Sequence, residues 1–195
     1  MLIAFIANLI PIKFKTDFPE IQKQFDLSIE VNDFKSVPGF NIVDDVLEDK
    51  QYAFLAGYEA NRIEAAFEYQ ENIIGKNTHI IFGVPAYYAG WETNSLFNNV
   101  NVVEDKRIVG SLNYSGATDV INTYKQLLRI INSMSSHNSN LCILPLSNKP
   151  MSLAAALVLV EKQKITNLLY DHPKQSSLRT DKLGKWHYYN IEWNE

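Results

Sequence analysis

The sequence predicts an α/β fold in which helices cover both faces of a mainly parallel sheet. The prediction rests on three segments that each run from an apolar strand through a polar turn bearing Gly or Pro into a helix. Their strands are Ala53–Ala56, Ile80–Phe82 and Leu141–Leu144. Such alternation is typical of stacked βαβ units. Because the turns after parallel strands gather on one edge of the sheet, the same three segments predict where a ligand would bind.

Length and composition are compatible with one domain spanning residues 1–195. The chain has 195 residues, of which 46% are hydrophobic, and this is enough to bury a full core. Residues 1–50 are the less certain part and a candidate for truncation. A net charge of -4 argues against a protein that coats a nucleic-acid backbone, so bulk nucleic-acid binding is not expected.

The single cysteine, Cys142, lies inside an apolar run, so the chain carries no disulfide framework and fits a reducing compartment such as the cytoplasm. We interpret it as a buried structural thiol rather than a nucleophile. The apolar segment Met1–Ile10 is too short for a membrane span and lacks a basic flank, and it is predicted to be a buried strand.

The remaining elements follow from periodicity. Asp17–Phe25 has apolar residues at helical spacing, whereas Asn32–Asp49 is predicted to be a loop or connecting arm. Further helices are expected from near Tyr58, over Val120–Met134, and over Ser152–Val160, which is apolar almost all round.

The C-terminal part is predicted to form two more strands. Ile165–Tyr170 gives the first and Trp186–Trp193 the last, and the last is free to run antiparallel. The polar segment Asp171–Lys185 is predicted to be the loop between them. No Walker, GxGxxG, paired CxxC, HExxH or GxSxG motif is present, so local signatures of phosphate cradles, zinc sites and serine hydrolysis are missing.

The candidate site residues lie in the turns. Glu59 and Arg62 share a helix face after Gly57, so Arg62 is a candidate to hold a phosphate or carboxylate, the alternative being an intrahelical ion pair. Trp91 is a candidate stacking platform or a packing anchor, and Glu92 is favoured by the helix dipole whatever its function.

Two basic segments offer anion contacts. Lys149 precedes Pro150 at the start of the apolar helix, where free N–H groups would receive an anion; the alternative is a lysine that covers exposed surface. The segment Lys174–Lys185, with Ser177 and Arg179, suits a phosphate clamp or lid, or an ordinary solvated hairpin. His172 and His187 flank this segment without nearby ligands, so no metal is expected.

Four runs stand out in about Gln51–Glu195: GYEANR, GVPAYYAGWETN, PLSNKPMSLAAAL and YDHPK. Together they resemble a poorly characterised group of bacterial Rossmann-like proteins found in defence islands. The group is similar in layout to second-messenger-sensing Rossmann-like domains, which implies a Rossmann-like three-layer sandwich. Ala89 stands where the group has Pro, and Ser147-Asn148 where it has Gly.

Function stays open among three hypotheses. The first is a domain that binds a nucleotide or nucleotide-like ligand in a bacterial defence or stress-response system. The second is a non-catalytic adaptor or effector subunit, with the N-terminal strand and Trp186–Trp193 as contact regions for a protein partner or for a homo-oligomer. The third is a nucleotide-directed hydrolase or glycosidase with Glu59 or Glu92 as acid or base. No cofactor is assigned, and whether the chain is an enzyme is left undecided.

Overall fold

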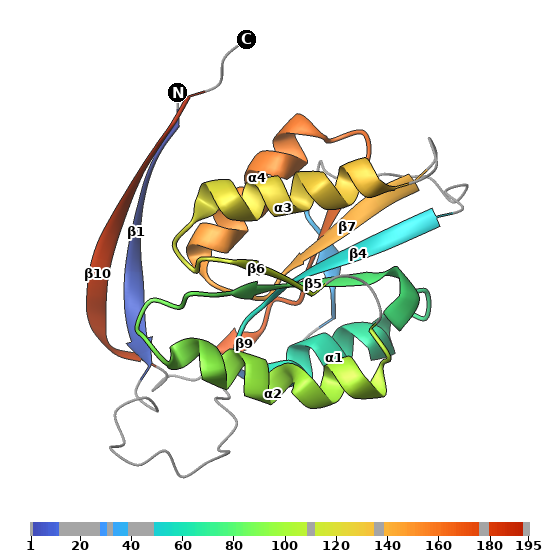
Figure 1. The fold of residues 1–195 in the computed structure, drawn as a ribbon, viewed down its shortest axis with the longest axis horizontal. Coiled ribbons are helices and arrows are strands. Elements are labelled where there is room, and N and C mark those ends of the chain that lie inside the picture. Colours follow the sequence, from blue (N-terminus) through green and yellow to red (C-terminus); the bar gives the residue numbers. More distant parts are fainter. Residues whose placement is uncertain are drawn as a thin grey trace.

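The computed structural model describes residues 2–11, 28–30, 33–38, 49–108, 112–134, 139–175 and 180–192. Its centre is a six-stranded sheet in the order β3-β8-β7-β4-β5-β6 (Figure 1). The strands are β3 (Lys35–Ser36), β4 (Asp49–Ala56), β5 (Thr78–Gly83), β6 (Leu112–Ser115), β7 (Ser139–Pro145) and β8 (Thr166–Tyr170). All neighbours run parallel except β3, which is antiparallel to β8.

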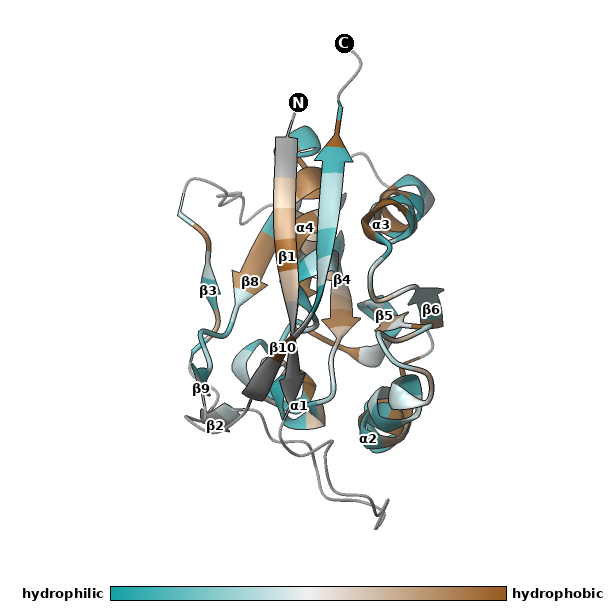
Figure 2. Ribbon diagram, turned by 90° about the vertical axis from the view of Figure 1, so that its left-hand side faces the viewer, coloured by the Kyte–Doolittle hydropathy of each residue, from teal (hydrophilic) through white to brown (hydrophobic). Residues whose placement is uncertain are grey.

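Helices cover both faces of this sheet, which confirms the predicted three-layer Rossmann-like sandwich. They are α1 (Ala60–Tyr69), α2 (Trp91–Asp105), α3 (Val120–Ser133) and α4 (Lys149–Glu161), with a short 3-10 turn, η2 (Gly75–Asn77), before β5. Alternate residues of β4 sort to the two layers: Phe54 packs in the core with α1 and α2, and Leu55 in the core with α3 and α4. The part of a parallel strand that is buried on both faces is apolar, as Tyr52–Ala56 of β4 is. Figure 2 shows this in the brown end of β4.

A separate ribbon stands beside the sheet (Figure 1). It pairs β1 (Leu2–Pro11) antiparallel with β10 (Thr180–Ile191). The C-terminal strand is therefore antiparallel, an orientation that the sequence analysis had left open. Its inner face is anchored where Tyr189 and Ile191 pack on α3 and α4. A second small pair joins β2 (Ser28–Glu30) to β9 (Lys174–Gln175).

Several predicted elements need correction. The N-terminal strand exists but is buried on one side only: Ile6 is buried, while Phe5 faces solvent. Within Asn32–Asp49, residues 35–36 form β3, and within Asp171–Lys185, residues 174–175 form β9 and residues 180–185 belong to β10. The helix predicted over Asp17–Phe25 lies outside the described residues. Strand β6 was not predicted, because it is short and leaves Leu112 and Tyr114 exposed at the sheet edge.

Candidate ligand site at the carboxyl edge of the sheet

The strand order reverses between β4 and β7. From β4 the chain proceeds outward to β5 and β6, and then crosses back to β7 and β8 on the other side. The turns after β4 and β7 are therefore neighbours at a topological switch point, where open α/β sheets bind ligands. Here the backbones approach closely: a Cβ built on Gly57 would lie 2.5 Å from the carbonyl oxygen of Leu146. Only glycine fits this crossing.

Arg62 is a predicted ligand contact, but its guanidinium is hydrogen-bonded to other groups of this chain. Its guanidinium donates two hydrogen bonds of 2.6 Å to the two carboxylate oxygens of Asp171, and Nη1 donates to the Leu146 carbonyl at 3.1 Å. Burial acts to lower the pKa of Arg62, but its bonds and charge interactions with Asp171 outweigh this, and the net direction is upward. Arg62 and Asp171 are both buried. The arrangement ties α1 to the ends of β7 and β8.

Glu59 belongs to the same buried cluster. Its Oε1 accepts the Ser28 amide at 2.7 Å, and its Oε2 lies 3.7 Å from Arg62 Nη1, the intrahelical pair given as the alternative for these residues. The carboxylate makes no capping hydrogen bond to α1. Glu59 therefore holds β2 against the start of α1 rather than closing the helix terminus.

Asp171 and a polar row on α2 were missed by the sequence reasoning. Three α2 side chains donate to the carbonyls of the β4–α1 turn: Ser95 and Asn99 to Gly57 at 2.7 and 3.0 Å, and Asn98 to Tyr58 at 2.9 Å. The spacing of this row, three and four residues apart on one helix face, was the available signal. For Asp171 the signal was an acidic residue placed directly after a strand on the same edge.

The start of α2 carries a carboxylate, that of Glu92, in the first turn of the helix. Gly90 precedes it in the left-handed conformation, with φ of 90°. The N–H of Glu92 itself, followed by those of Gly90 and Ala86, holds the pKa of the Glu92 carboxyl below its ordinary value, while desolvation opposes them. Glu92 Oε2 is nonetheless shielded from solvent and has no hydrogen-bond partner in the described part of the chain. Burial, and then the Glu92 charge, raise the pKa of Tyr58 to about 12.

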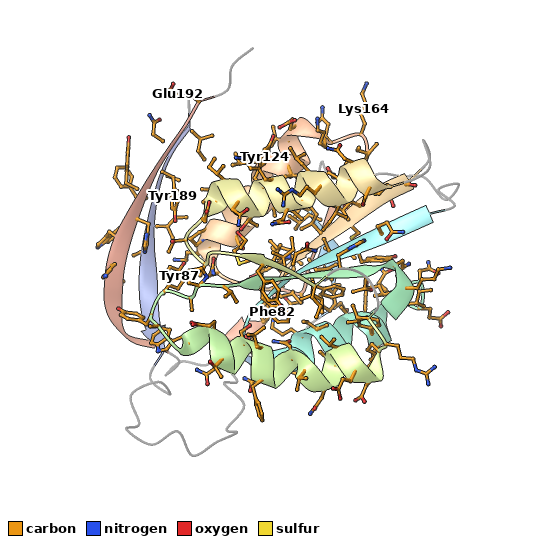
Figure 3. All side chains as sticks on the ribbon, in the orientation of Figure 1. Phe82, Tyr87, Tyr124, Lys164, Tyr189 and Glu192 are labelled. Atoms are coloured by element: carbon orange, nitrogen blue, oxygen red, sulfur yellow. The ribbon has the colours of Figure 1, made fainter. Side chains whose placement is uncertain are left out.

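Aromatic rings line the same region. Tyr88 and the half-buried Trp91 lie with ring centroids 4.5 Å apart, and Tyr87 contacts His187 of the ribbon at 5.6 Å. Tyr189 anchors the ribbon through its hydroxyl, which donates to the Thr118 carbonyl at 2.8 Å. Figure 3 shows Tyr87 and Tyr189 on the side of the ribbon that faces the body. Burial, and then the nearness of Tyr189 and Tyr58, raise the pKa of Tyr87.

Lys149 is exposed at the start of α4, but most of the helix N–H groups expected to receive an anion are engaged. Asn148 accepts the Met151 amide at 3.0 Å with its side chain and the Ser152 amide at 3.0 Å with its carbonyl, and Pro150 has no N–H. The N-terminus of α3 is likewise capped by Asp119, which accepts the Asn122 amide at 2.8 Å. Of the four helices, α1 and α2 lack a side-chain cap.

Two predicted residues, Ser177 and Arg179, lie outside the described residues. Within the described ranges, no group of three His, Cys, Asp or Glu is placed to hold a metal ion. In the same ranges, none of the helices combines the length and apolarity that crossing a membrane requires. Cys142 is a buried free thiol, as interpreted from the sequence.

The chain was compared with known proteins by sequence and by fold. It matches no family model, no curated protein and no solved structure.

Proposed function

We propose that the chain is a binding domain for a nucleotide or nucleotide-like ligand at the carboxyl edge of the sheet. The observation that carries the proposal is the strand order, which reverses between β4 and β7 and makes the turns at Gly57 and Leu146 neighbours. In this class of sheet the crevice at the reversal is the usual ligand position. The likeness of the Gln51–Glu195 turns to defence-island proteins supports a role in bacterial defence or stress response.

Two helix starts on this edge, those of α1 and α2, have no side-chain cap, and we place the phosphate at α1 because it lies beside the Gly57–Leu146 crossing. Helix α1 follows the first strand of the parallel set, and no side chain caps its first N–H groups. Such groups bind anions because of their direction and of the helix dipole. The exposed Lys149, which follows the Leu146–Asn148 turn packed against Gly57, adds positive charge on the same edge. Arg62 shapes this turn through Leu146 and Asp171 rather than contacting the ligand.

The base and sugar suit the neighbouring α2 side of the edge. Trp91 and Tyr88 offer aromatic faces for stacking. Three acceptors of α1 and α2 are shielded from solvent and unpaired within the described residues: Glu92 Oε2 and Asn99 Oδ1 on α2, and Asn61 Oδ1 in the first turn of α1. Buried acceptors of this kind favour a ligand that brings hydrogen-bond donors, such as an exocyclic amine or ribose hydroxyls.

Thermal unfolding in the presence of mononucleotides, dinucleotides, cyclic nucleotides, NAD and short oligonucleotides tests the proposal. A ligand present at one hundred times its Kd stabilises the folded state by about 2.7 kcal/mol. Lys149→Ala and Glu92→Gln are expected to weaken binding of the ligand found. Lys164→Ala is the matched control, since Lys164 is also exposed but precedes β8 at the opposite edge (Figure 3). No stabilisation by any probe, or unchanged affinity in both site variants, would count against the proposal.

A nucleotide-directed hydrolase or glycosidase is the second candidate, and the unpaired Glu92 Oε2 favours it. A carboxylate that stays ionised can act as a nucleophile or stabilise a developing positive charge at a sugar carbon. Chromatography of the bound nucleotide after incubation separates the two functions. Turnover by the wild type that is lost in Glu92→Gln, at a ligand concentration high enough to saturate the variant, would establish the enzyme. A ligand that stays intact with the wild type would show binding without turnover.

A further inference from the structure

The β1/β10 ribbon has two strand edges that are open in the described part of the chain. Each of its strands pairs only with the other there, and neither joins the six-stranded sheet. An open strand edge presents a row of backbone donors and acceptors that another strand can bind. Soluble proteins usually protect such edges with charged residues, proline or bulges.

The two edges differ in this protection. β10 contains Asp181, Lys182 and Lys185, whereas the ten residues of β1, LIAFIANLIP, include no charged residue. Pro11, at the far end of β1, cannot donate to a neighbouring strand, but every second residue before it directs its N–H and C=O away from β10, toward the open edge. The pairing of β1 with β10 is irregular between Ala7 and Leu9 and between Ile10 and Pro11, so Leu2–Ala7 is the stretch of β1 that has no charge, proline or bulge to keep another strand from pairing.

The outer face of the ribbon is also aromatic. Phe5 is 69% exposed, Trp186 65% and Tyr188 57%, and the rings of Phe5 and Tyr188 lie 5.2 Å apart. With about 200 Å² for a whole aromatic side chain, these three leave roughly 400 Å² in solvent. That is about half of what one partner contributes to a standard protein interface, and it lies next to the open edge.

We propose that β1 pairs antiparallel with β1 of a second copy of this chain, forming a four-stranded sheet in the order β10-β1-β1-β10 across a two-fold axis. Two identical strands that pair antiparallel satisfy two-fold symmetry by construction, so the same edge serves both partners. A strand that fits this edge is extended, at least as long as the regular stretch Leu2–Ala7, and apolar to match the aromatic face beside it. β1 itself has these properties. Pairing also brings the Phe5 side chains of the two copies onto one face, where cross-strand aromatic contacts add stability.

Sedimentation equilibrium over a range of concentrations tests this proposal. The expected mass is twice the 22.3 kDa of the chain at high concentration and falls toward one chain on dilution. Phe5→Lys places a charge within the regular stretch of β1 that pairs, and it is expected to raise the dimer dissociation constant at least ~10-fold. Trp186→Lys puts the same charge on the outer face but on β10, and Phe97→Lys puts it on α2, where Phe97 is 52% exposed. Both controls are expected to keep the dimer.

Hydrogen exchange of the β1 amides gives a second readout, independent of any variant. In the monomer β10 protects one edge only, whereas the paired dimer protects both edges, so more β1 amides slow down as concentration rises. A monomer at every concentration would overturn the proposal, even if β1 then bound an extended peptide of another protein. A dimer insensitive to Phe5→Lys, or lost equally on Trp186→Lys or Phe97→Lys, would place the contact elsewhere and overturn it too.

Discussion

At the scale of single residues, buried charges at the carboxyl edge of the sheet hold together three segments that are distant in the sequence. Arg62 binds Asp171 across 109 positions of sequence and also holds the Leu146 carbonyl. The Glu59–Arg62 pair was visible in the sequence because helix geometry brings residues three apart together. Asp171 was not visible, since only the strand order places the end of β8 beside α1.

Asp171→Asn is expected to destabilise the fold by about 3 kcal/mol, because it leaves the buried guanidinium of Arg62 without its counter-charge. Urea unfolding measures this change. Asp105→Asn is the matched control: Asp105 is exposed at the end of α2, and its loss is expected to change stability by less than about 0.5 kcal/mol. Equal, small effects of the two substitutions would mean that the Arg62–Asp171 pair does not hold the fold.

Gly57→Ala is expected to cost about 1 to 3 kcal/mol, since the new methyl group would overlap the Leu146 carbonyl, a backbone atom that cannot swing away. Gly90→Ala is a useful comparison. Gly90 has nothing within 4 Å of the added atom, so only its left-handed backbone resists the change, at about 1 kcal/mol. Thermal unfolding ranks the two. A Gly57→Ala protein as stable as the wild type would show that the two turns do not touch.

Cys142 is expected to be unreactive in the folded protein. Burial raises the pKa of its thiol to about 12, so almost no thiolate forms near neutral pH, and a thiol reagent needs the thiolate. Labelling at pH 8 is expected to be negligible in buffer and complete, at one thiol per chain, in urea. Rapid labelling of the native protein would mean that β7 opens readily.

At the scale of elements, periodicity predicted what is buried on well-defined faces. The strands β4, β5 and β7 and the helices α3 and α4 appear where the apolar pattern put them. Strand β6 was not predicted, because an exposed edge strand does not require an apolar run. The ribbon was half predicted: both strands were foreseen, but their pairing joins the two ends of the chain, a contact that no local pattern records.

Tyr189→Phe is expected to loosen the ribbon by about 1 kcal/mol, the usual contribution of one hydrogen bond, because it removes the bond to the Thr118 carbonyl. Amides of β10 should then exchange about five times faster, as this free energy implies. Tyr188→Phe is the control, since Tyr188 points to the exposed face of the same strand. Identical exchange in both variants would show that the ribbon is held by its apolar contacts alone.

At the scale of the whole molecule, the switch point and the candidate site are consequences of the strand order of the six-stranded sheet. The sequence predicted that turns after strands would share an edge, but it did not say which turns would be neighbours. That depends on the crossing from β6 back to β7, which places Gly57 against Leu146. Sites that assemble across such a crossing combine residues with no common sequence signal.

The same arrangement predicts an order of local stability. β4 has a strand on each side and a helical layer on each face, so its amides should open only when the whole protein unfolds. Each strand of the ribbon has one pairing partner, and the ribbon is anchored on its inner face alone. In dilute protein its amides should therefore exchange through an opening of lower free energy than that of β4. Native-state hydrogen exchange in low urea measures both. If the ribbon opens first, it can move away from the turns after β5 and β6 while the sheet stays folded, and this opening would give the proposed ligand a way in. If its amides exchange only with those of β4, ribbon and sheet form one cooperative unit, and the proposed ligand would have to reach the edge without displacing the ribbon.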